Sequence, residues 1–132
     1  MKRNLNNKIE MLANFFYRAL LLKLTPAKMK QEVLDEIQIA SEETEIIEDA
    51  NQIIDHYQEF KTILVGMLAT NWKWERIPAL IQALLIIGVY AIKMTDASKA
   101  LVINEIVVLT KTLEPDFEFG FVNAILDKIN KI

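Results

Sequence analysis

His56 is the single histidine of the 132-residue chain, and histidine is the side chain most often used as a general acid or base. It lies in a stretch with helical spacing, directly after Asp55. Side chains at successive helix positions do not face each other, so Asp55 does not orient the ring as a catalytic pair requires. We therefore interpret His56 as a surface or structural residue and predict no catalytic residue.

The other patterns that support catalysis or metal binding are also absent from the sequence. The chain has no cysteine, which excludes disulfides, thiolate zinc sites and cysteine nucleophiles. Gly66, Gly88 and Gly120 are isolated, whereas phosphate-binding loops need clustered glycines. The acidic middle of the chain lacks the Glu-x-x-His pair of a di-metal helical bundle. We expect no metal and no cofactor, and we do not expect an enzyme.

Two tryptophans flank a lysine at residues 72–74. Trp72, Lys73 and Trp74 are followed closely by Arg76, and interleaved aromatic and basic side chains can stack on single-stranded bases. Alternatively, the tryptophans close one end of a helical core, where their large apolar area is best used. The second interpretation is favoured.

Charge is distributed unevenly along the chain. Residues 1–30 contain seven basic side chains and one acidic, residues 31–70 contain one basic and ten acidic, and the net charge is −3. This asymmetry suggests two different partner surfaces. The alternative, which charge alone favours, is two solvated helix faces.

Apolar residues recur at helical spacing over nearly the whole chain. Three glycines and three prolines are too few for the frequent turns of a β-sandwich or barrel. The sequence therefore predicts an all-α fold, a single compact bundle of about six or seven helices formed by residues 1–132. The expected helices are Leu5 to near Leu24; one opened by Thr25 and Pro26 that buries Met29, Val33 and Ile37; a long one over 46–67; one from Pro78 to Lys93; one capped by Asp96 or Ser98; and one capped by Asp116.

The most hydrophobic run, residues 79–92, is expected to be the central helix. It contains Gln82 and is shorter than the roughly 20 apolar residues of a membrane span. The N-terminal MKRNLNNKIE has no apolar core of a signal peptide. We expect a soluble, cytoplasmic protein that does not contact membranes.

Three ordered motifs in the second half of the chain resemble a known family. They are IQALLIIGVYAI at 81–92, VINEIVVLTK at 102–111 and FVNAILDK at 121–128, preceded by WKWERI. Together they resemble the NusB family, in which the corresponding motifs are RxxILRxAxYEL, INEAVELAK and FVNGVLDK. The same fold also occurs as the RNA-binding domain of a ribosomal RNA cytosine methyltransferase, but no methyltransferase segment follows here, which favours the free-standing role.

The resemblance implies a NusB-like function in transcription antitermination. Family members bind boxA-type RNA, as on nascent ribosomal RNA, together with a small-subunit ribosomal protein that acts as Nus factor E, within the transcription elongation complex. They hold no metal and catalyse no reaction. By the same resemblance, the expected RNA-binding residues are Lys2, Arg3, Lys8, Phe121 and Asn123. The family-motif residues are Asn104, Glu105, Asp127 and Lys128.

The matched residues also have structural interpretations. Phe121 could instead pack in the core, and Glu105 could favour the N-terminal dipole of its helix. Asp127 and Lys128 could form a local ion pair. Ile86 and Ala91 replace a family Arg and Glu, so we expect them to be buried or to lie in a partner groove.

A second function stays open: a helical adaptor without RNA binding. Its acidic segment 31–70 would then bind a basic partner protein.

Overall fold

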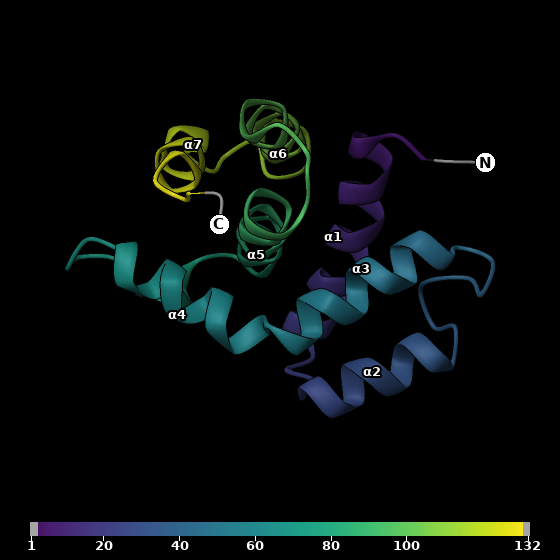
Figure 1. Ribbon diagram of the computed structural model, residues 1–132. Coiled ribbons are helices and arrows are strands. Elements are labelled where there is room, and N and C mark those ends of the chain that lie inside the picture. The colour runs from purple at the N-terminus through teal and green to yellow at the C-terminus, as the bar shows by residue number, and fades with distance from the viewer. Residues whose placement is uncertain (1–2, 131–132) are drawn as a thin grey trace.

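Seven α-helices and one short 3-10 turn form the structure, a computed structural model that describes residues 3–130 (Figure 1). No strand occurs within this range, which confirms the all-α prediction. The helices are α1 (Leu5–Leu21), α2 (Pro26–Leu34), α3 (Thr44–Asp55), α4 (Tyr57–Met67), α5 (Ala79–Met94), α6 (Lys99–Leu113) and α7 (Phe119–Asp127), and the 3-10 turn η1 is Trp74–Arg76.

Several helices begin at a residue whose side chain accepts a hydrogen bond from a backbone N–H group of the first turn. Asn4 accepts from the Asn7 amide at 2.9 Å and begins α1. Thr25 accepts from the Lys28 amide, with Pro26 at the first helical position, as predicted. Of the two caps proposed for α6, the structure uses Ser98.

The ends of α1 and α2 are closed by residues in the left-handed backbone region. Lys23 has φ 56° and Glu36 has φ 54°. After α1, the Lys23 and Leu24 amides donate to the carbonyls of Leu20 and Ala19, which is a Schellman motif. At the end of α2, the Glu36 and Ile37 amides donate in the same pattern to the carbonyls of Val33 and Glu32, so α2 ends at Leu34. The prediction that Ile37 belongs to the buried stripe of α2 is therefore wrong, because Ile37 follows this turn and is exposed.

The predicted long helix over residues 46–67 is broken at His56 into α3 and α4. His56 has φ −109° and ψ 11°, outside helical geometry. α3 packs on α1 and α2, whereas α4 packs on α5. The break changes the direction of the chain, so that α3 and α4 can pack against different helices. The periodic pattern of apolar residues does not reveal this break.

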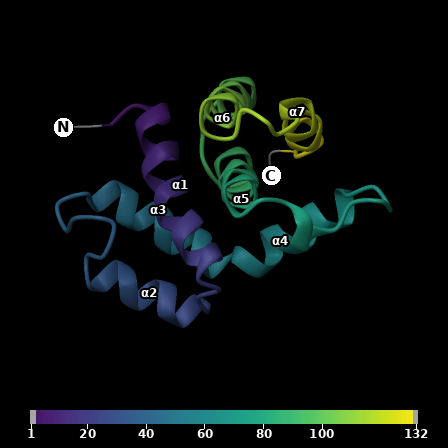
Figure 2. The same cartoon turned by 180° about the vertical axis from the view of Figure 1, so that it is seen from behind.

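α5 is the central helix and contacts α1, α3, α4, α6 and α7. Figures 1 and 2 show it surrounded by these helices from both sides. Every residue from Ala83 to Ile92 is buried, and the prediction for Ile86 and Ala91 is confirmed at 0% and 4% exposure. In the part of the chain that the structure describes, no helix combines the length and apolar character needed to cross a bilayer.

Gly88 permits the close packing of α5 against α6 and α7. A Cβ atom at this position would lie 2.7 Å from Leu126 Cδ2 and 2.9 Å from Ile106 Cδ1, closer than side-chain contacts allow. Both neighbours are fully buried. A larger residue at position 88 would therefore force the buried side chains of Leu126 or Ile106 to move.

α7 differs from its predicted start. Its cap is Glu118, whose carboxylate accepts from the Gly120 amide at 3.0 Å, so the prediction of Asp116 as the cap is wrong. At the other end, the Lys99 ammonium donates to the Asp127 carbonyl at 2.6 Å and the Lys93 ammonium to the Asn130 carbonyl at 3.3 Å. Two cations thus complement the negative end of the α7 dipole.

Candidate nucleic-acid interface

Three aromatic rings from two segments that are distant in sequence meet beside the start of α7. Phe121 stacks on Trp72, with ring centroids 4.5 Å apart and an interplanar angle of 27°. Phe117 meets Phe121 edge-on at 5.7 Å. All three side chains are half-buried and pack against the core, so each keeps part of its ring accessible. We call Trp72, Phe117 and Phe121 the aromatic cluster.

The two tryptophans of the 72–74 segment have different environments. Trp74 is buried, which confirms the interpretation that a tryptophan closes the core. Trp72 is half-buried and belongs to the aromatic cluster. Nearby, the Lys111 ammonium lies 4.3 Å from the centroid of the exposed Phe119 ring, a cation–π contact. Phe119 is not one of the three rings of the aromatic cluster.

The basic N-terminal residues are paired with acidic side chains of the α3 region. The Arg3 guanidinium donates to both Glu43 carboxylate oxygens, at 2.6–3.1 Å. This hydrogen-bonded contact lowers the pKa of Glu43 and raises that of Arg3. The Lys8 ammonium donates to one carboxylate oxygen of Glu45. Lys2, also expected to contact RNA, lies outside the described residues.

The two family-motif residues of α6 have different environments. Asn104 is exposed, and the Asn6 amide of α1 donates to the Glu105 carboxylate at 2.7 Å. α6 begins at Lys99, so Glu105 lies beyond the first turn, and the prediction that it complements the N-terminal dipole is wrong. It joins α6 to α1 instead.

The motif residues of α7 are exposed. Asn123 lies two residues after Phe121 with its side chain accessible, and Asp127 and Lys128 are also exposed. No ion pair joins Asp127 to Lys128 among the residues described, so that expectation is wrong. Asp127 is instead linked to Lys99, because its backbone carbonyl accepts a hydrogen bond from the Lys99 ammonium.

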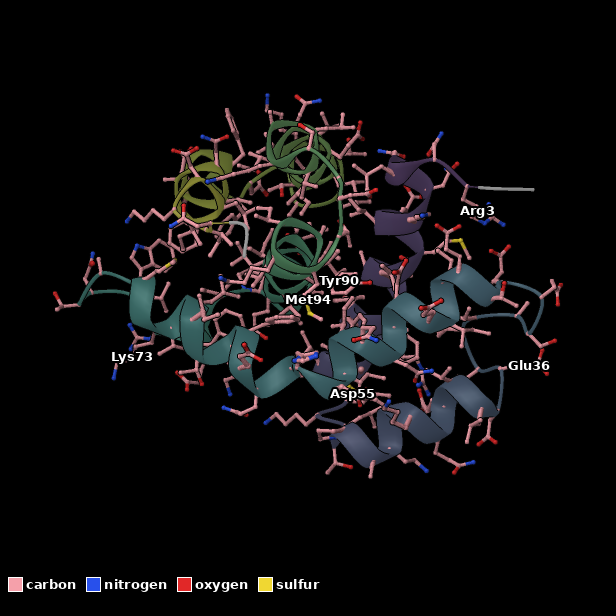
Figure 3. All side chains as sticks on the ribbon, in the orientation of Figure 1. Arg3, Glu36, Asp55, Lys73, Tyr90 and Met94 are labelled. Atoms are coloured by element: carbon pink, nitrogen blue, oxygen red, sulfur yellow. The ribbon has the colours of Figure 1, made fainter. Side chains whose placement is uncertain are left out.

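The basic N-terminal side chains and the aromatic cluster are far apart. Figures 1 and 2 show α1 and α7 on opposite sides of the α5–α6 pair. In Figure 3, Arg3 and Lys73, which follows Trp72 in the chain, lie at opposite ends of the molecule. The structure brings Phe121 together with Trp72, and it does not bring either near Arg3.

A hydrogen-bonded pair that sequence reasoning missed lies next to Lys8. The Tyr90 hydroxyl of α5 donates to the Asp49 carboxylate of α3 at 2.5 Å. Both residues, with Lys8, line a cavity of about 100 Å³. Burial raises the pKa of Asp49, against the opposing effects of the Tyr90 hydroxyl and Lys8. Burial and Asp49 also raise the pKa of Tyr90. The sequence features that could have indicated this pair are an acidic residue on a helix, Asp49, and a tyrosine within an apolar run, Tyr90.

Across residues 3–130, no group of three or more His, Asp or Glu side chains is arranged to hold a metal ion. The model of the NusB family matches residues 8–131 of the chain. The chain belongs to the NusB family. The relatives of this family described below are named for transcription antitermination, which is not a catalytic activity, in agreement with the sequence-based expectation that the chain is not an enzyme.

Similar proteins carry the same family name. The chain is 35% identical over 82 residues to the transcription antitermination protein NusB of Campylobacter fetus, which covers 62% of each chain. It is 31% identical over 99 residues to that of Ligilactobacillus salivarius, covering 75% of this chain and 76% of the relative. It is also 31% identical over 105 residues to that of Nitratiruptor, covering 79% and 75%. No solved structure matches the chain.

Proposed function

We propose that the chain acts in transcription antitermination by binding boxA-type RNA together with a small-subunit ribosomal protein, within the elongation complex. The NusB family match over residues 8–131 and the relatives named for antitermination support this assignment. The ribosomal protein and the boxA sequence come from the family resemblance. The chain itself supplies surfaces with the chemistry that single-stranded RNA requires.

The aromatic cluster is the observation that carries the proposal. Phe121 belongs to the FVN motif, and its ring is fixed against Trp72 while staying partly accessible. A base that stacks on such a ring contributes about 1–3 kcal/mol to binding, whatever its identity. Asn123, exposed two residues further on, has both donor and acceptor atoms for a base edge. Stacking would thus supply affinity, and the amide would supply selectivity.

The N-terminal cations would contribute electrostatic attraction. Arg3 and Lys8 are held by Glu43 and Glu45 on the surface, and a phosphate could replace either carboxylate. A strand that contacts both Phe121 and Arg3 would have to cross α6, where Asn104 is exposed. The proposed RNA path therefore runs from the start of α7 over α6 to the start of α1.

The proposal is tested by measuring binding of boxA-like RNA with and without the ribosomal protein. We expect Phe121→Ala to weaken binding about tenfold or more, because it removes the fixed stacking surface. Phe119→Ala is the matched control, since Phe119 is exposed in the same turn but outside the cluster. Changing Lys2, Arg3 and Lys8 together to Gln should weaken binding and reduce its dependence on salt, by about 0.7 log units for each phosphate that these cations bind.

Two results would contradict the proposal. One is a parent protein that binds no boxA-like RNA at low salt, even with the ribosomal protein present. The other is equal binding by the parent, the Phe121 variant and the Gln variant, all folded. Either result would favour the adaptor function, in which the acidic segment binds a basic protein.

A further inference from the structure

A pocket lies beside the aromatic cluster. This pocket, of about 570 Å³, opens between α4 and the segment 68–75. Its volume falls within the range of roughly 300–1,000 Å³ typical of small-molecule sites. Its wall includes Trp72, the ring that stacks on Phe121. We call this space the α4 pocket.

We propose that the α4 pocket binds one nucleotide of single-stranded RNA, with the base against Trp72 and a phosphate beside Lys61 and Lys73. This inference rests on the proposed function and extends it, because it adds a nucleotide site beyond Phe121. Trp72 and Lys73 belong to the WKWERI segment that precedes the family motifs, whereas Lys61 lies outside that segment, the motifs and the basic N-terminus.

The aromatic part of the argument is the position of Trp72. Its ring is fixed by the stack on Phe121 and by Phe117, 6.3 Å away between centroids. It remains half-buried, and it lines the pocket at the same time. Phe121 and the α4 pocket therefore share one rigid side chain, so consecutive nucleotides could occupy the two sites.

The charges of the pocket favour a phosphate. Lys61 and Lys73 both line it, and neither has an ion-pair partner among the described residues, unlike Arg3, Lys8, Arg18 and Lys30. Among residues 3–130, Glu75 is the one carboxylate in the lining, so the described lining carries a charge of +1 on a chain of net charge −3. Figure 3 shows Lys73 at the outer edge of the molecule, next to α4. An unpaired lysine at the mouth of a pocket is available to an anion.

The remaining lining fits a base and a ribose. Val65 and Leu68 provide apolar contact, while the hydroxyls of Thr62 and Thr70 can donate or accept hydrogen bonds. An apolar side chain of a partner protein could use the same apolar surface. The two unpaired lysines favour the nucleotide, because an RNA-associated partner rich in basic residues would bring like charges together.

Tryptophan fluorescence tests the base contact, because the chain has two tryptophans. Trp74→Phe leaves Trp72 as the reporter, and Trp72→Phe leaves the buried Trp74. We expect a boxA-like single-stranded RNA to quench the emission of the parent and of Trp74→Phe strongly, and that of Trp72→Phe much less, because Trp74 also lines the pocket but is buried. Quenching as strong in Trp72→Phe as in Trp74→Phe would overturn the inference.

Charge reversal tests the phosphate contact without changing buried groups. Lys61→Glu with Lys73→Glu should weaken RNA binding at least tenfold and make its salt dependence shallower by about 0.7 log units for each phosphate that the two lysines bind. Lys28→Glu on α2 is the matched control, since Lys28 is also exposed and has no ion pair among the residues described; it should bind like the parent. Equal effects of the double and control variants would overturn the inference.

The outcomes separate this inference from the proposed function. If the parent binds RNA and Phe121→Ala weakens binding, but the double lysine variant binds RNA like the parent, only the α4 pocket assignment fails. The same conclusion follows if the double variant no longer binds the ribosomal protein but still binds RNA. If the parent binds no RNA at all, both proposals fail.

Discussion

At the scale of single residues, Gly88 carries the tightest constraint described above. Gly88→Val would place new atoms against Leu126 and Ile106, both fully buried, and should lower the free energy of unfolding by about 1–3 kcal/mol. Gly66→Val is the control, because a Cβ at Gly66 meets nothing within 4 Å; it should change stability by less than about 0.5 kcal/mol. Urea unfolding of both variants checks the prediction, and equal losses would contradict it.

Asp49 should make stability fall with rising pH. Its raised pKa means that the native state holds the proton more tightly than the unfolded chain. The stability that it contributes is present below the ordinary Asp value of 3.8 and is lost as pH rises through the higher native pKa. Asp49→Asn keeps an acceptor for Tyr90 and removes the charge. We therefore expect its stability relative to the parent to rise with pH from about 4 and then level off.

The comparison variant for Asp49 is Tyr90→Phe, which removes the hydroxyl donor and leaves the carboxylate. It should be less stable than the parent and lose stability more steeply over the same pH range, because an unbonded buried carboxylate is penalised further. Denaturant unfolding between pH 3 and pH 8 measures both effects. A constant difference between Asp49→Asn and the parent across this range would contradict the assignment.

At the scale of elements, the end of α1 is strained by a lysine in the left-handed region. Lys23→Gly should raise the free energy of unfolding by about 0.5–1 kcal/mol, because glycine adopts φ 56° without a Cβ clash. Lys28→Gly, on the exposed side of α2, should instead lower it by up to about 1 kcal/mol. Thermal unfolding distinguishes the two, and a loss of stability in Lys23→Gly would be the contrary result.

The pairing of α1 with α3 leads to a prediction about binding. Glu43→Gln with Glu45→Gln releases Arg3 and Lys8 and should strengthen RNA binding about two- to fivefold, since exposed ion pairs are weak competitors. Glu42→Gln with Glu48→Gln removes the same charge from residues without an ion pair in the described range. Equal gains in both double variants would indicate general electrostatics and not release of the pairs.

Most elements could be predicted from the sequence because their chemistry is local. Thr25 and Ser98 are caps whose hydroxyls accept from amides three residues on, and the apolar run 79–92 has the composition of a central helix. The turns at Lys23 and Glu36 could not be predicted, since neither residue type favours left-handed backbone. The break at His56 depends on neighbours that are distant in sequence.

At the scale of the whole molecule, the candidate site could be predicted only in pieces. The FVN motif places Phe121 and Asn123 on one helix, and the structure agrees. The contacts of Phe121 with Trp72 and of Arg3 with Glu43 join segments far apart in the chain. The periodicity of apolar residues does not predict such contacts, because they depend on how the other helices pack around α5.

The ion pairs between the N-terminal cations and α3 also make RNA binding an ion exchange. A strand that displaces Glu43 and Glu45 from Arg3 and Lys8 leaves two carboxylates facing water, and these attract sodium or potassium ions from solution. The RNA meanwhile releases cations condensed on its phosphates. The two ion flows oppose each other, so fewer cations are released than phosphates are contacted. The complex would therefore tolerate changes in cellular ionic strength better than one formed by the same helix with glutamine at both positions.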